Sequence, residues 1–61
     1  MTPKATDFNL PSNILDEITN NTGVITQVNQ TNDNPLEYEV IVWDAGGNVI
    51  YTCPHPCKLK T

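Results

Sequence analysis

The sequence predicts a small, mainly β protein of the α+β class: a three-stranded antiparallel meander with one short N-terminal helix and extended terminal arms. The main observation is an apolar stretch at 36–43, then a glycine-containing turn at 44–48 and a second apolar run at 49–53, which together are typical of a β-hairpin. A β-branched run at 24–28 predicts the third strand. With 61 residues the chain is predicted to form a single small domain, 1–61.

Residues 1–12 are predicted to form an extended arm, because they contain two prolines and show little periodicity. Phe8 and Leu10 are its isolated apolar side chains, and we expect both to be protein-contact residues. Chain ends are usually ordered only when something holds them. The arm is therefore expected either to lie on another chain or to pack across the sheet.

A short helix is predicted over residues 13–22. Asn13 is a suitable N-cap, and Ile14 and Ile18 fall on one face at positions i and i+4. Gly23 is expected to end the helix in a left-handed conformation. So short a helix needs packing against another element to persist.

The β-meander is predicted to span residues 23–53. Its first strand covers 24–28, and the polar, asparagine-rich segment 29–35 is expected to be a loop. Residues 54–61 are expected to form a C-terminal tail.

Alternation along the strand 36–43 separates its side chains onto two faces. One face carries Leu36, Tyr38, Val40 and Val42, and the other carries Glu37, Glu39, Ile41 and Trp43. One short helix cannot cover both faces of a three-stranded sheet. Ile41 and Trp43 are therefore predicted to contact another protein, with burial under the N-terminal arm as the alternative.

The segment Cys53-Pro54-His55-Pro56-Cys57 is the one cluster of residue types that commonly bind zinc. Structural zinc sites normally use four protein ligands, and Cys53, His55 and Cys57 supply three. An extended path would also place the two cysteines about 12 Å apart, too far for a shared metal or a disulfide unless the chain turns. Free thiols in a structural tail are the favoured interpretation, with a zinc site and a disulfide as alternatives, and no cofactor is expected.

The net charge of −4 argues against nucleic acid as a ligand. The seven acidic residues are scattered along the sequence, so solubility explains them better than mimicry of nucleic acid on a basic partner. We predict neither a membrane span nor a signal peptide, because no apolar stretch is long enough for a span and the Met1 end lacks the basic and apolar regions of a signal peptide.

An enzyme is not expected. A Cys and a His two residues apart need a third group and a water-excluding pocket for nucleophilic catalysis, and so small a fold offers little room for one. Glu37 and Glu39 resemble a catalytic carboxylate pair only in spacing, and a solvated sheet face explains them better.

In general character the chain resembles the small head-decoration or cement proteins of tailed-bacteriophage particles. The resemblance covers the short length, the richness in Asn and Thr, and the hairpin sequence Val-Trp-Asp-Ala-Gly-Gly-Asn-Val-Ile-Tyr at 42–51. It implies a non-enzymatic virion or host-cytoplasm protein that binds other protein subunits such as capsid protein, as a homo-oligomer or part of a larger assembly. The alternative is a metal-stabilised binding module or a phage-encoded inhibitor of a host protein.

Overall fold

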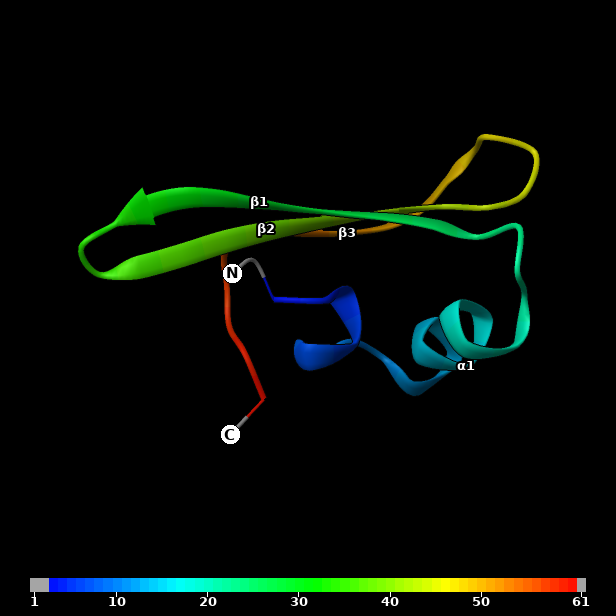
Figure 1. Cartoon of the computed structure of the whole chain (residues 1–61), viewed down its shortest axis with the longest axis horizontal. Coiled ribbons are helices and arrows are strands. Elements are labelled where there is room, and N and C mark those ends of the chain that lie inside the picture. The colour runs from blue at the N-terminus through cyan, green and yellow to red at the C-terminus, as the bar shows by residue number, and fades with distance from the viewer. Residues whose placement is uncertain (1–2, 61) are drawn as a thin grey trace.

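A three-stranded antiparallel sheet forms the centre of the protein in a computed structural model that describes residues 3–60 (Figure 1). The elements in chain order are the 3-10 helix η1 (Ala5–Asp7), the helix α1 (Ser12–Asn20) and the strands β1 (Ile25–Asp33), β2 (Leu36–Trp43) and β3 (Val49–Cys57). The sheet order β1-β2-β3 confirms the predicted meander. The outermost residues of the predicted arms, Met1, Thr2 and Thr61, lie outside the described residues.

Residues 3–60 cover the sheet on one side only. Figure 1 shows η1, α1 and the C-terminal segment on the same side of the three strands. We call this side the inner face; in β2 it carries Tyr38, Val40 and Val42, which are all buried. The outer face carries the alternate β2 side chains, as the alternation predicts.

One apolar core fills the space between the inner face and the N-terminal elements. Its buried members are Ala5, Phe8, Leu10, Ile14, Tyr38, Val40, Val42 and Cys57. Phe8 and Tyr38 meet edge to face with ring centroids 5.5 Å apart, a favourable arrangement for two aromatic rings. The N-terminal third of the chain thus supplies half of this core.

Strand β1 is longer than predicted. The expected loop at 29–35 is wrong, because β1 continues to Asp33, which pairs with Leu36 across a turn at Asn34 and Pro35. The register shifts between Gln30 and Asn32, as at a β-bulge. Polar side chains do not prevent a strand here, because β1 is an edge strand whose ladder to β2 supplies the backbone hydrogen bonds.

The turn between β2 and β3 lies at 44–48, as predicted. The N–H of Asp44 donates to the carbonyl oxygen of Asn48 at 2.8 Å, and the N–H of Gly47 donates to the carbonyl oxygen of Asp44 at 3.0 Å. Gly47 has φ of 86°, a conformation that glycine adopts without steric cost. This turn fixes the register of the hairpin.

The N-terminal arm is held by the chain's own C-terminal segment. Phe8 forms an isolated antiparallel bridge with Leu59, and the N–H of Lys60 donates to the carbonyl oxygen of Asp7 at 2.9 Å. The side chain of Asp7 also accepts a hydrogen bond from the N–H of Lys4. Of the two possibilities predicted for the arm, the structure shows packing within the same chain.

Helix α1 differs from the prediction at both ends. Pro11 occupies the N-cap position and Asn13 lies inside the helix, so Asn13 is not the cap. The helix ends at Asn20, and Gly23 has no left-handed conformation. A Cβ atom at Gly23 would lie 2.6 Å from the Cβ of Ala45, so this glycine instead permits a close approach to the hairpin turn.

Candidate protein-docking face

The outer face gathers apolar side chains from all three strands at the end of the sheet beside the 44–48 turn. Directly paired residues of antiparallel strands share a face, so Ile25 of β1 joins its partner Trp43. Ile50 of β3 follows the alternation set by Thr52 and its partner Ile41, and the register shift between Val42 and Trp43 lets the adjacent Val49, which pairs with Trp43, share this face. We name these residues the outer-face patch: Ile25, Ile41, Trp43, Val49 and Ile50.

The outer-face patch remains in contact with solvent. Ile25 is 61% exposed and Val49 is 55% exposed, while Ile41 and Trp43 are half-buried by their neighbours in the sheet. Because the described part of the N-terminal arm packs on the inner face, it does not cover Ile41 and Trp43. For residues 3–12 of the arm, the alternative predicted for these two residues is therefore wrong.

Phe8 and Leu10 do not belong to the outer-face patch. Phe8 is 0% exposed and Leu10 is 5% exposed, both inside the core of the same chain. The prediction that they contact another protein is therefore corrected. Isolated apolar residues in an extended segment can contact another protein or join the core of their own chain. Alternation along β2 does not show on which face of the sheet the arm packs.

The other end of the outer face is polar and hydrogen-bonded. Asn29 Nδ2 donates to Glu39 Oε1 at 3.1 Å, and Gln27 Nε2 donates to Asn29 Oδ1 at 2.9 Å. Glu39 precedes Ile41 by two residues on the same face, so a carboxylate lies about 7 Å along the strand from the apolar patch. The outer face therefore combines apolar and acidic side chains.

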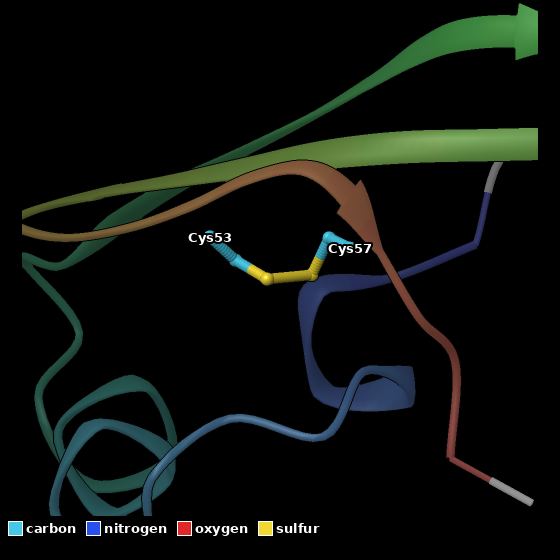
Figure 2. Close-up of a disulfide and its surroundings, with 2 residues drawn as sticks. All are labelled: Cys53 and Cys57. Carbon is cyan, nitrogen blue, oxygen red and sulfur yellow. A yellow bond between two sulfur atoms is a disulfide. The ribbon is translucent and has the colours of Figure 1, made fainter.

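Cys53 and Cys57 form a disulfide on the inner face (Figure 2). The register explains it: Cys53 pairs with Val40 and Cys57 pairs with Tyr38, so both sulfur atoms point into the core. Residues 54–56 bulge out between these two pairs, which leaves the Cα atoms 5.6 Å apart. The expectation of free thiols, which assumed an extended tail, is therefore wrong, as is the tail's predicted start at 54.

The disulfide removes both thiolates from a zinc site. Within residues 3–60 no group of three or more His, Cys, Asp or Glu side chains is placed to hold a metal ion. His55 lies in the bulge and reaches across the sheet, away from the two sulfur atoms. The predicted candidates Cys53, His55 and Cys57 thus do not converge on one point.

His55 instead joins a row of polar side chains across the three strands. Its Nδ1 is hydrogen-bonded to Thr31 Oγ1 at 2.7 Å, and its Nε2 lies 3.6 Å from Glu37 Oε1. A hydroxyl, an imidazole and a carboxylate are the groups used in nucleophilic catalysis, but such a site must also exclude water. The side chain of His55 is 49% exposed, so this row is open to solvent.

Asp44 adds a fixed negative charge at the tip of the hairpin. Its Oδ1 accepts hydrogen bonds from the N–H groups of Asn48 and Gly46, each at 2.9 Å. These bonds, that of Asn48 first, lower the pKa of the Asp44 carboxyl below its ordinary value. Asp44 is therefore ionised at neutral pH beside Trp43.

A second apolar surface lies at the opposite end of the sheet. It is a groove of about 330 Å³ between the start of β2 and the C-terminal segment. The exposed side chains of Leu36 and Leu59 lie among its walls, together with Pro56. The sequence offered no signal for this groove, because it depends on the path of the C-terminal segment.

Three of the outer-face residues could not be identified from the sequence. Ile25, Val49 and Ile50 belong to strands whose register with β2 is unknown from sequence, although alternation along each strand was visible. Comparisons with protein-family models, curated proteins and solved structures each gave no match to this chain. Among residues 3–60, no helix is long and apolar enough to cross a membrane.

Proposed function

We propose that this chain is a non-enzymatic protein-binding module that attaches to another protein through the outer face of its sheet. The observation that supports the proposal is the position of Trp43 and Ile41. They lie at the centre of the outer-face patch, while the described N-terminal elements pack on the inner face. Aromatic side chains at the centre of an apolar patch commonly dominate binding energy in protein interfaces.

The specific form of the proposal is an accessory protein that stabilises neighbouring subunits of a viral particle. It rests on the resemblance to decoration and cement proteins, and it puts the protein in the virion or the host cytoplasm. A sheet with one bare face suits this role, because the partner supplies the missing second layer.

A second candidate is an inhibitor that folds alone and then binds one host protein. It is favoured by the burial of Phe8 and Leu10, which lets the chain complete its own core without a partner. The two candidates differ in the bound stoichiometry. An accessory protein occupies many equivalent sites on one particle, whereas an inhibitor forms a complex with a single copy of its target.

Peptide selection tests the proposed docking face and does not require an identified partner. Peptides enriched from a random display library on the immobilised wild-type protein should bind through the outer-face patch. Trp43→Ala should weaken them about 30-fold or more, which corresponds to the roughly 2 kcal/mol typical of a binding hot spot.

Leu36→Ala is the matched control, because it removes an exposed apolar side chain, 54% exposed, at the other end of the sheet. It should leave binding within about twofold of wild type, less than 1 kcal/mol. Circular dichroism must show both variants folded. Enriched peptides that bind Trp43→Ala as tightly as wild type, or a selection that enriches none, would contradict the proposal.

A further inference from the structure

The net charge of the protein lies entirely on its sheet and turns. Residues 24–57 contain no lysine and four acidic residues, so their formal charge equals the whole net charge of −4. The four are Asp33, Glu37, Glu39 and Asp44. The remaining residues carry three acidic side chains and all three lysines, which cancel. Acidic residues are thus equally frequent in both parts of the chain, and the sheet carries the net charge because it contains no lysine.

The lysines belong to the segments that cover the inner face. Lys4 precedes η1, and Lys58 and Lys60 follow β3 in the C-terminal segment, which leaves the sheet on the same side as η1 and α1 (Figure 1). Backbone hydrogen bonds tie this segment to the N-terminal arm, from the N–H of Lys60 to Asp7 and from the N–H of Asn9 to the carbonyl of Lys58. No described lysine therefore belongs to a strand of the sheet or to its turns.

Two of the four carboxylates stand on the outer face itself. Glu37 and Glu39 share this face with Ile41 and Trp43 along the same strand, and Asp44 follows Trp43 in the turn. Asn29 orders the carboxylate of Glu39, and His55 lies beside that of Glu37. The apolar patch is thus flanked along the strand by fixed negative charge.

From this arrangement, and resting on the proposed function, we infer that the partner surface is both apolar and cationic. Its apolar side chains pack on Ile41 and Trp43, and its lysine or arginine side chains reach Glu37 and Glu39. Complementary charges next to an apolar centre fix the orientation of a partner and speed its approach.

The negative charge of the outer face also argues against the other kinds of ligand that could bind there. A second copy placed face to face offers no lysine from its own sheet, so Glu37 and Glu39 would find no cationic partner on it. Nucleic acid and anionic lipid are repelled by the same carboxylates. A neutral apolar surface would offer no cationic side chain to Glu37 and Glu39 at the edge of the contact.

Two designed peptides test the inference. Each is an amphipathic helix of about 18 residues, close to 27 Å long, with one leucine face. The remaining positions are lysine in one peptide and glutamate in the other. Affinity is measured at 0.15 M salt by fluorescence anisotropy of the labelled peptide, and burial of the patch is followed by the emission of Trp43.

The lysine peptide is expected to bind and to shift the Trp43 emission to shorter wavelength, whereas the glutamate peptide should bind at least about tenfold more weakly. The double variant Glu37→Gln, Glu39→Gln should bind the lysine peptide about tenfold more weakly than the wild type does. Its matched control, Asp16→Asn, Glu17→Gln, removes the same charge from α1 and should change affinity no more than about twofold, because salt screens charges beyond about 8 Å.

The results that differ from this expectation contradict different parts of the proposal. Equal weakening by both double variants would show general attraction to an acidic protein and would overturn the inference, as would the failure of both peptides to bind. If the two peptides bind with equal affinity and Trp43→Ala abolishes the binding of both, the inference of a cationic partner is overturned, while the proposed docking face is supported. Binding of the lysine peptide that survives Trp43→Ala would overturn the proposed function itself.

Discussion

Phe8→Ala is expected to remove a large part of the free energy of unfolding of the protein. Phe8 is 0% exposed and packs edge to face on Tyr38 at the centre of the core. Truncating such a side chain typically costs about 3 to 5 kcal/mol, from lost burial and from the cavity left behind. A chain of 61 residues has a total stability of only about 3 to 9 kcal/mol, at roughly 0.05 to 0.15 kcal/mol per residue.

Urea unfolding followed by circular dichroism measures this effect. Leu36→Ala serves as the control, because Leu36 is 54% exposed and its truncation should change the free energy of unfolding by less than about 1 kcal/mol. Equal unfolding midpoints for the two variants would show that the arm does not belong to the core. Deleting residues 1–10 should for the same reason unfold the protein, rather than leave an intact hairpin with weaker attachment.

Reduction of the disulfide is expected to lower the free energy of unfolding by about 2 kcal/mol. Cys53 and Cys57 close a loop of five residues, for which the loss of chain entropy in the unfolded state gives about that value. Reduction also removes the covalent link that holds Cys57 in place. Cys57 pairs with Tyr38 and lies two residues before Leu59, which forms the bridge to Phe8. The effect should appear as a lower urea midpoint in the presence of dithiothreitol.

The variant Cys53→Ala, Cys57→Ala is the matched control, since its unfolding curve should not respond to the reductant. The wild type should also show no free thiol per chain when treated with a thiol reagent under denaturing conditions. Two reactive thiols in protein purified without reductant, or one tightly held zinc ion per chain, would contradict the disulfide.

The hairpin was predictable because its determinants are local. Alternation over 36–43 sets the two faces of β2, and the sequence Asp-Ala-Gly-Gly-Asn at 44–48 supplies both the side-chain acceptor and the glycine with positive φ that the turn uses. The placement of Ile41 and Trp43 on the face opposite Val40 and Val42 followed from the same alternation.

The remaining features depend on contacts between distant segments. Asn29 to Asp33 have the composition of a loop, and only pairing with β2 makes them a strand. The prolines at 54 and 56 suggested an extended tail, yet register with Val40 and Tyr38 brings the flanking cysteines together. The separation of the lysines from the outer face also depends on the fold, because both lysine-bearing ends of the chain lie on the inner side of the sheet.

Collisional quenching of Trp43 tests most directly whether the outer face is bare and acidic. Trp43 is the only tryptophan, so its fluorescence reports this face alone. Stern–Volmer constants for caesium, iodide and acrylamide are measured and divided by those of free N-acetyltryptophanamide. We predict clear quenching by acrylamide, because the patch is open, and a larger relative constant for caesium than for iodide, because the carboxylate of Asp44 follows Trp43 in the chain and the sheet carries the net negative charge. Weak quenching by all three agents, or iodide quenching equal to that of caesium, would contradict the account.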